Sequence, residues 1–434
     1  MSTNPYASPA PLTEPRKGSL VVIFLAVFID LLGFGMVLPL LPVYARDFGA
    51  PENGIEIGLL MASFSAMQFL FAPAWGRLSD RIGRRPVLLV GLAGSVVFYT
   101  LFGLATVWHS MFWLFVSRIG AGIAGATITT AQAYIADTTT LETRGKGMAL
   151  IGAAFGLGFT FGPMFGGLTL PGAGDAPSPG PGYAAGLLSA FALALAMFKL
   201  PESLNRESKP AGRKILDFGA LGDALRTPSI GPLLLTLFVC ILAFANFETT
   251  LSLLLTTVKF GGKPFTIREV PLYVFSYIGL TLTVAQGLVV RRLIGKIHEA
   301  NMAAGGALLD IVGFGGMILA IRTANTWILF AALTVMVFGF AMMMPSLNSL
   351  LSRRSDPTKQ GGVLGIGQSA SALARILGPM LGIPLLQQRS VLPLMMPYVV
   401  GAVLMVGGLV MIVVSARGGH DYGVPATPHT GLLE

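Results

Sequence analysis

Residues 76–86 read Gly76-Arg77-Leu78-Ser79-Asp80-Arg81-Ile82-Gly83-Arg84-Arg85-Pro86, a block with four arginines and one aspartate. Long apolar runs precede and follow this block, and the first of them ends at Trp75. Charged side chains are costly in hydrocarbon, so such a block is expected at a membrane surface, between two spanning helices. The stretch therefore predicts a charged hinge on a membrane protein.

The composition of the whole chain supports the same class. Of 434 residues, 53% are hydrophobic and 11% are charged, and the mean hydropathy is +0.74. Most of such a chain must face lipid or other helices. A spanning helix needs roughly 20 apolar residues, and windows of that length predict an all-α integral membrane protein with twelve transmembrane helices. The expected spans are residues 19–43, 55–75, 87–107, 111–135, 148–170, 183–200, 229–256, 272–290, 302–321, 326–351, 362–387 and 392–415.

The distribution of Lys and Arg predicts the orientation, because short cytoplasmic loops retain these residues. Most of the 29 Lys and Arg residues lie on the side of the hinge, and the opposite loops carry few. Both termini are therefore expected in the cytoplasm, and the protein in the cell (inner) membrane. The opposite loops carry Arg46, Lys259, Lys263, Arg268, Arg322 and Arg389.

The chain also contains an internal repeat. Gly162-Pro163-Met164-Phe165-Gly166 aligns with Gly378-Pro379-Met380-Leu381-Gly382 at an offset of 378 − 162 = 216 residues, about half of the chain. This offset predicts two pseudo-symmetric halves of six helices each, with the transport site between them. The expected division is a disordered cytoplasmic tail 1–18, halves 19–200 and 229–415, a cytoplasmic linker 201–228 and a cytoplasmic tail 416–434.

Five charged residues fall well inside the predicted helices, away from the ends of the spans: Asp30, Arg118, Glu248, Asp310 and Arg375. A charged side chain at the centre of a bilayer costs at least about 2.5–3.5 kcal/mol on insertion scales. Each of these residues therefore needs a structural or functional reason, and together they are the main functional candidates.

Three motifs resemble those of a known family. The form G-x-L-S-D-R-x-G-R-R-P at 76–86 resembles the signature loop of major facilitator transporters. The string Asp30-Leu31-Leu32-Gly33-Phe34-Gly35, followed by Pro39 and Pro42, resembles the first helix of the drug/proton antiporter branch, tetracycline efflux proteins in particular. Gly158-x3-Gly162-Pro163-x2-Gly166-Gly167 resembles the motif associated with antiporters. The resemblance covers nearly the whole chain and is closest from Asp30 to Gly167.

The resemblance and the residues together suggest a proton-coupling pair. Apolar surroundings favour the neutral form of the Asp30 carboxyl, so it can take up a proton and lose it when a cation arrives. Arg118 is its obvious partner, and the family has an arginine at this point of the fourth helix. The alternatives are an Asp30 held permanently by a nearby donor, an Arg118 that only braces two helices, and a glycine motif that only allows close packing.

The resemblance implies that the hinge locks the cytoplasmic side in the outward-facing state. Asp80 and Arg81 are expected to exchange partners with Asp137 and Glu142, or with the start of the eleventh helix near Gly361. A topology anchor made of positive charge is the alternative. The gating set is Gly76, Asp80, Arg81, Gly83, Arg84, Arg85 and Asp137.

A substrate cavity is expected between the halves. Phenylalanines near an acid suit an amphipathic cation, although such aromatic residues also serve packing or face lipid. Arg375 has three possible partners: Glu248, Asp310, or an anionic group of the substrate. The candidate lining is Gln68, Phe247, Glu248, Gln286, Asp310 and Arg375.

Enzymatic functions are disfavoured. The four histidines lack metal-ligand spacing, and no Gly-x4-Gly-Lys-Ser/Thr sequence is present, so no metal, cofactor or ATP site is expected. The single cysteine, Cys240, excludes an intramolecular disulfide. The expected partners are the lipid bilayer, a small-molecule substrate and protons, without nucleic acid, and the protein is expected to be a monomer.

The predicted function is proton-coupled antiport, that is efflux, of an amphipathic drug-like compound by alternating access. A tetracycline-like or other multidrug substrate is expected, driven by the proton gradient. The alternatives are a major facilitator carrier of a sugar or small metabolite, working as a symporter or uniporter, and a non-transporting membrane receptor. The direction of proton movement relative to the substrate distinguishes antiport from symport.

Overall fold

The computed structural model describes residues 17–51, 54–139, 141–171, 176–204, 227, 229–293, 296–355, 360–386 and 391–418. These residues form helices joined by short connections, which confirms the all-α class. Most of the expected tails and of the expected linker 201–228 lies outside the described residues.

The first part of the chain forms α1 (Lys17–Val37), α2 (Leu41–Asp47), α3 (Ile55–Ile82), α4 (Arg84–Val107), α5 (Met111–Gly125), α6 (Ile128–Thr138), α7 (Leu141–Leu168) and α8 (Gly180–Lys199). The second part forms α10 (Gly231–Thr257), η1 (Phe260–Gly262), η2 (Val270–Phe275), α11 (Ser276–Val284), η3 (Ala285–Val290), α12 (Arg291–Leu293), α13 (Glu299–Thr323), α14 (Thr326–Arg353), α15 (Gln360–Leu385) and α16 (Val391–Gly418). Of these, η2 and η3 are π-helical turns within one continuous segment.

Two expected helices are interrupted. The first, expected over 19–43, ends at Val37, and the short α2 follows from Leu41. Pro39 and Pro42 explain this break, because proline lacks the backbone N–H that a continuing helix needs. The helix expected over 111–135 is divided into α5 and α6 at Ala126 and Thr127.

Ten of the described helical segments are long and apolar enough to cross a membrane. In this count, α5 and α6 form one segment, Met111–Thr138, and the elements from η2 to α12 form another, Val270–Leu293. The remaining two expected spans, 148–170 and 362–387, coincide with α7 and α15. In α7 only the shorter stretch Ala153–Leu168 is strongly apolar.

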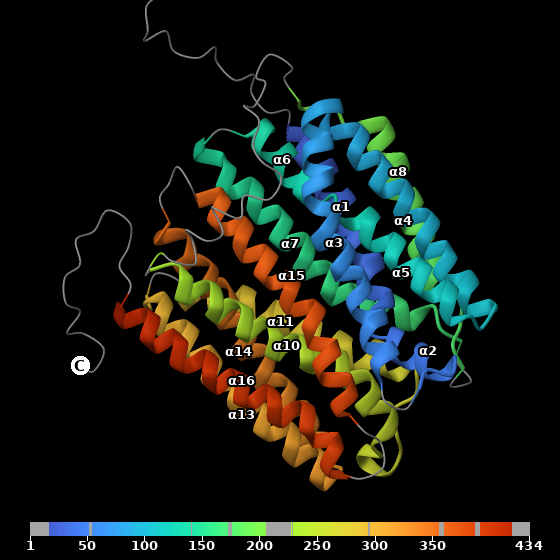
Figure 1. The fold of residues 1–434 in the computed structure, drawn as a ribbon, viewed down its shortest axis with the longest axis vertical. Coiled ribbons are helices and arrows are strands. Elements are labelled where there is room, and N and C mark those ends of the chain that lie inside the picture. The colour runs from blue at the N-terminus through green and yellow to red at the C-terminus, as the bar shows by residue number, and fades with distance from the viewer. Residues whose placement is uncertain are drawn as a thin grey trace, which may run out of the picture.

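The early helices, α1 to α8, pack mainly against one another, and so do the late helices, α10 to α16. Helix α1 packs against α7 and α8, whereas α10 packs against α15 and α16, and α13 against α14. Figure 1 shows these two sets, blue to green and yellow to red, on opposite sides of the molecule. The contacts that join them are made by α3 with α15, by α7 with η2 and α11, and by α2 with α10.

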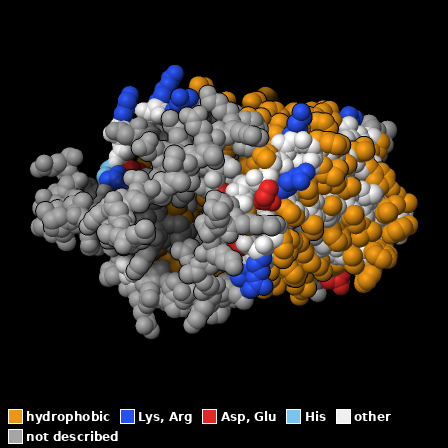
Figure 2. All heavy atoms as spheres, turned by 90° about the horizontal axis from the view of Figure 1, so that it is seen from above, with side chains coloured by type: hydrophobic (Ala, Val, Ile, Leu, Met, Phe, Trp, Pro, Cys, Tyr) orange, Lys and Arg blue, Asp and Glu red, His pale blue; other side chains and the backbone are white. Residues whose placement is uncertain are grey.

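The described surface is strongly apolar. Hydrophobic side chains cover much of it in Figure 2, where Lys, Arg, Asp and Glu side chains are confined to small groups. Phe198 and Trp327 are more than four-fifths exposed, at 82% and 85%. An apolar surface of this extent is suited to contact with lipid.

Glycines allow the backbones of α1 and α7 to touch. A Cβ added to Gly162 would lie 2.7 Å from the Cα of Gly35, and one added to Gly166 would lie 2.6 Å from the backbone oxygen of Met36. Both distances are shorter than real Cβ contacts, so only glycine fits at these two positions of α7. The late helices repeat the arrangement, because a Cβ on Gly378 of α15 would lie 2.6 Å from the Cβ of Ala245 of α10.

We expect Gly162→Ala to lower the thermal stability of the protein. Alanine is the better helix former by roughly 1 kcal/mol, so a loss would report the forced separation of α1 from α7. Gly156→Ala on the same helix is the control, since a Cβ there would have no neighbour within 4 Å. The measurement is the temperature at which buried Cys240 becomes reactive to a thiol dye in detergent. A midpoint for Gly162→Ala at or above that of Gly156→Ala would contradict the close contact.

Candidate functional site

Asp30 lies in the middle of α1 and is half-buried against α4. The Ser95 hydroxyl donates a hydrogen bond of 2.6 Å to the Oδ1 atom of Asp30. The Tyr99 hydroxyl lies 3.5 Å from the backbone oxygen of Asp30, at the limit of hydrogen bonding. A hydroxyl can turn from donor to acceptor, so Ser95 can accompany either protonation state of this carboxyl.

Arg118 on α5 is almost completely buried, with 1% of its surface exposed. Its guanidinium carbon lies 4.5 Å from the centre of the Phe64 ring and 5.6 Å from that of Phe34. Aromatic faces attract a cation, most strongly where water is absent. Among the described residues no salt bridge joins Arg118 to Asp30. Instead, the Arg118 guanidinium lies over two aromatic rings, and the Asp30 carboxylate accepts a hydrogen bond from a serine.

The hinge is organised around Arg84, at the start of α4. Arg84 is nearly buried and forms salt bridges with Asp80 and, at 3.0 Å, with Asp137 of α6. Gly83 has a φ angle of +114°, a conformation that favours glycine at the turn between α3 and α4. The structure thus brings Asp80 and Asp137 together through one guanidinium.

The other hinge residues lie around this network. Arg85 donates a 2.6 Å hydrogen bond to the backbone oxygen of Met197 of α8, while Arg81 is exposed. Gly76 faces Thr129 of α6. The expected contacts with the Glu142 side chain and the Gly361 region fall on side chains outside those that the structure describes.

Sequence reasoning missed Glu202, which directly follows α8 at the start of the expected linker. Its carboxylate accepts hydrogen bonds from the backbone N–H groups of Arg84, at 2.9 Å, and Arg85, at 3.2 Å. A carboxylate at a helix N-terminus satisfies free N–H groups and favours the helix dipole. An acid placed just after an apolar helix near an Arg-rich loop was the available signal, but sequence alone does not reveal which helix start it meets.

Glu248 of α10 and Arg375 of α15 interact electrostatically, without a direct salt bridge among the described residues. Glu248 is half-buried and Arg375 is exposed. Glu248 is one of the possible partners of Arg375 that the sequence left open, and this electrostatic interaction favours it among the described residues. An exposed guanidinium in a helix that contacts both sets of helices is available to a ligand.

Two further candidates are buried inside the late set of helices. Phe247 is buried and makes edge contacts with Phe314 and Tyr398, 6.3 Å and 6.4 Å between ring centres, inside the late set of helices. Asp310 is only 1% exposed and lies against Gly339 and Phe340 of α14. Neither side chain therefore lines open space in this conformation.

The two glutamines differ in their surroundings. Gln68 of α3 donates a 3.2 Å hydrogen bond to the backbone oxygen of Gly125, and Trp75 donates one of 2.7 Å to that of Ile123. These bonds satisfy carbonyl groups at the end of α5, where the chain breaks before α6. Gln286 lies in the π-helical turn η3 and is exposed.

The glycine motif of α7 contacts both sets of helices. Gly158, Gly162 and Gly166 lie against α1, and a Cβ on Gly167 would lie 2.7 Å from the Cβ of Leu272 in η2. Pro163 sits inside α7 between these contacts. Helix α7 therefore contacts both α1, which contains Asp30, and the late set of helices.

We expect Arg84→Lys to lower the unfolding temperature in detergent by roughly 2–4 °C or more, since a lysine ammonium cannot reproduce the planar fork between two carboxylates. Arg81→Lys is the matched control, because Arg81 is exposed. Equal midpoints for the two variants would show that the Arg84 bridge does not stabilise this state.

Charged groups within spanning helices are characteristic of membrane proteins that move solutes or ions. The structure accordingly defines a multi-pass membrane transporter. The chain belongs to the Major Facilitator Superfamily, whose family model matches residues 23–379. Members of this family are transporters and not enzymes, and the resemblance seen in the sequence is confirmed.

The chain is also similar to individual transporters of this family. The chain is 33% identical over 357 residues to the class E tetracycline resistance protein of Escherichia coli, covering 82% of this chain and 84% of that protein. It is 31% identical over 367 residues to the class D protein of Salmonella ordonez, covering 83% and 88%. The crystal structure of the human organic anion transporter MFSD10 (TETRAN) matches with a TM-score of 0.68 and 28% identity, covering 92% of this chain and all of that one.

Proposed function

We propose that this protein is a proton-coupled antiporter that exports an amphipathic compound. The observation that carries the proposal is Asp30, a carboxyl in the middle of α1 whose described partner is the neutral hydroxyl of Ser95. Without a fixed cationic partner, this carboxyl is free to exchange its proton with a substrate. The similarity to tetracycline resistance proteins over four-fifths of the chain supports export.

The proposed architecture has twelve spans in two six-helix halves, 19–200 and 229–415. The proposed location is the cell (inner) membrane, with both termini in the cytoplasm. The glycine contacts support the two halves. Gly162 meets α1 and Gly378 meets α10 in equivalent ways, and these glycines are separated by the 216-residue offset of the repeat, 378 − 162. Alternating access then corresponds to rocking of one half against the other.

Contacts between the two sets of helices support a state closed on the outer side and open to the cytoplasm. Near the ends opposite the hinge, Gly58 of α3 meets Pro379, and Gly167 of α7 meets Leu272. Toward the hinge, Gln368 and Ser369 of α15 are exposed, as is Gln286 of η3. In the proposed state the two sets of helices therefore touch at the outer end and expose polar side chains toward the cytoplasmic end.

In the proposed cycle, proton and substrate compete for the same state of the transporter. A proton on Asp30 removes the negative charge that a cationic group of the substrate would meet, and a bound substrate favours loss of the proton. Because this linkage is reciprocal, the substrate affinity falls as the pH is lowered and Asp30 becomes protonated. Arg118, held between two aromatic rings, adds a fixed positive charge in the same half of the molecule.

Asp30→Asn tests this scheme. We expect substrate binding to release protons from the wild-type protein in detergent, and the variant to bind with little dependence on pH and without proton release. The probes are cationic, zwitterionic, anionic and neutral amphipathic compounds, read by a pH dye. Glu56→Gln, at an exposed acid in the first turn of α3, is the control and should behave as wild type. Uphill transport at the wild-type rate by Asp30→Asn would exclude Asp30 as the proton carrier.

A second candidate function is transport of an organic anion, and Arg375 favours it. At the position of the first half that corresponds to Arg375 lies Phe159 (375 − 159 = 216), which packs edge-on against Phe34, 5.7 Å between ring centres. The proposed second half thus has a cation, Arg375, where the first half has an aromatic residue. Charge on one side and aromatic surface on the other suit an amphipathic compound with a charged group. The similarity to MFSD10, described as an organic anion transporter, supports this class.

Arg375→Gln separates these two candidates. If an anionic group of the substrate binds Arg375, the variant should lose at least about tenfold in affinity for anionic compounds and little for uncharged analogues, since a charge-assisted hydrogen bond contributes about 1.5–3 kcal/mol. Arg322→Gln, at an exposed arginine of α13, is the charge-matched control. Equal losses of affinity for charged and uncharged compounds would assign Arg375 a structural role. The proton-coupled exporter of a cationic compound would then be the better supported of the two candidate functions.

A further inference from the structure

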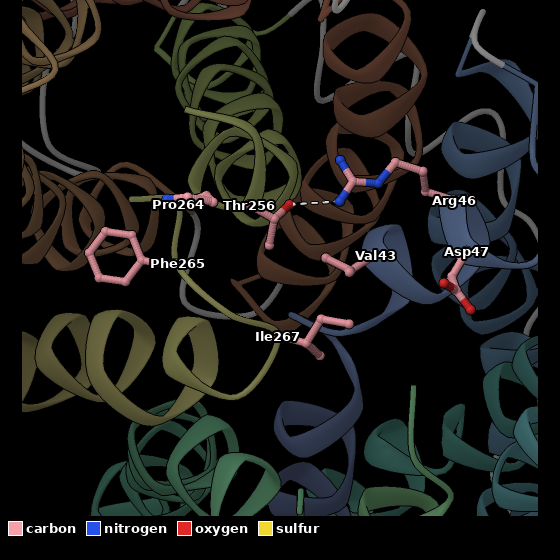
Figure 3. A pocket seen from close by; sticks show the side chains of 7 residues that line it. All are labelled: Val43, Arg46, Asp47, Thr256, Pro264, Phe265 and Ile267. Carbon is pink, nitrogen blue, oxygen red and sulfur yellow. Dashed lines mark hydrogen bonds between the residues drawn. The ribbon is translucent and has the colours of Figure 1, made fainter. Parts of the chain in front are cut away.

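A pocket of about 460 Å³ lies at the end of the molecule opposite the hinge, between α2, the C-terminal end of α10 and the loop that follows η1 (Figure 3). None of the charged residues within the spans lines it. Its lining residues are Val43, Arg46, Asp47, Thr256, Pro264, Phe265 and Ile267.

Arg46 reaches across this pocket from α2 to α10. Its Nη1 atom donates to the Thr257 hydroxyl at 3.2 Å and its Nη2 atom to the Thr256 hydroxyl at 3.1 Å. Both hydroxyls donate their own hydrogens to backbone oxygens of α10, for example Thr257 to Leu253 at 2.7 Å. The guanidinium therefore meets only neutral acceptors, which hold a cation less strongly than an anion does.

The nearest acid does not neutralise Arg46. In Figure 3 the Asp47 carboxylate points away from the guanidinium, and it faces His109 at 3.9 Å instead. Burial lowers the pKa of Arg46, and the neighbouring Asp47 charge offsets this in part. An arginine nevertheless keeps its charge at any physiological pH, so the pocket contains a cation without a direct anionic partner among the described residues.

The remaining walls are largely apolar. Val43 and Ile267 are buried aliphatic residues, and Phe265 adds a half-buried aromatic ring. We propose that this pocket is a binding site for an amphipathic anion, with a sulfonate or carboxylate on the Arg46 guanidinium and an apolar body against Val43, Phe265 and Ile267. The anion replaces the threonine hydroxyls as the acceptor, so its binding releases the hydrogen bonds that join α2 to α10.

Protection of an introduced cysteine tests this site. In a Cys240→Ala background, Pro264→Cys places a thiol at an exposed position in the pocket wall. The probes are naphthalene-2-sulfonate and its uncharged match naphthalene-2-sulfonamide, and the readout is the rate of maleimide labelling in detergent. We expect the sulfonate to slow labelling and the sulfonamide to be at least about tenfold weaker.

Variants of Arg46 complete the experiment. Arg46→Gln should raise the half-protecting sulfonate concentration at least about tenfold, and Arg46→Lys, which keeps the charge, should raise it less. Arg322→Gln should leave protection intact, and a cysteine introduced at exposed Thr323 outside the pocket should not be protected. Equal protection by both probes, or protection by the sulfonate that survives Arg46→Gln unchanged, overturns the proposal.

This site does not depend on the proposed proton coupling. The labelling assay uses no gradient, and Asp30→Asn should leave protection at Pro264→Cys unchanged. Absence of proton release from the wild-type protein together with intact protection at Pro264→Cys would thus exclude the antiport scheme and keep the outer site. Proton release from the wild-type protein without protection by the sulfonate would keep the antiport scheme and exclude the outer site.

Discussion

A charged side chain within an apolar membrane segment costs free energy unless a neighbouring group stabilises it, and this constraint organises the molecule. It places the arginine block of 76–86 at the end of α3, and it leaves few charges inside the helix bundle. Each of those charges has a different neighbour. Ser95 donates a hydrogen bond to Asp30, two phenylalanine rings lie against Arg118, and Arg375 interacts electrostatically with Glu248.

The neighbours of Asp30 and Arg118 determine how firmly these charges hold their helices together. A close salt bridge between Asp30 and Arg118 would hold two helices together and would resist protonation of the acid. A serine and two aromatic rings stabilise the same charges less rigidly, because a hydroxyl rotates and a ring accepts a cation over a broad area. In the proposed cycle, no salt bridge between these two charges then has to be broken when a proton arrives at Asp30.

Sequence reasoning identified the elements of this structure better than their partners. Apolar windows predicted nearly all helices, since a run of about 20 hydrophobic residues can be recognised in the local sequence alone. The break after Val37 follows from Pro39 and Pro42, although one continuous helix was expected over 19–43. Ser95, Phe64 and Glu202 escaped prediction, because serine and phenylalanine are ordinary in membrane helices and the contact of Glu202 with the start of α4 spans more than a hundred residues of chain. Long-range contacts of this kind have no signature in one sequence.

The two ends of the molecule differ in how their charges are satisfied. At the hinge, Asp80, Arg84 and Asp137 bind one another within the early helices, and Glu202 closes the same group. At the opposite end, Arg46 instead crosses to Thr256 and Thr257 of α10. In the proposed cycle, opening at this end breaks the second set of bonds and leaves the first intact. Because those bonds join a cation to neutral acceptors, their loss costs less than the loss of a salt bridge, and an anion arriving at Arg46 would lower that cost further.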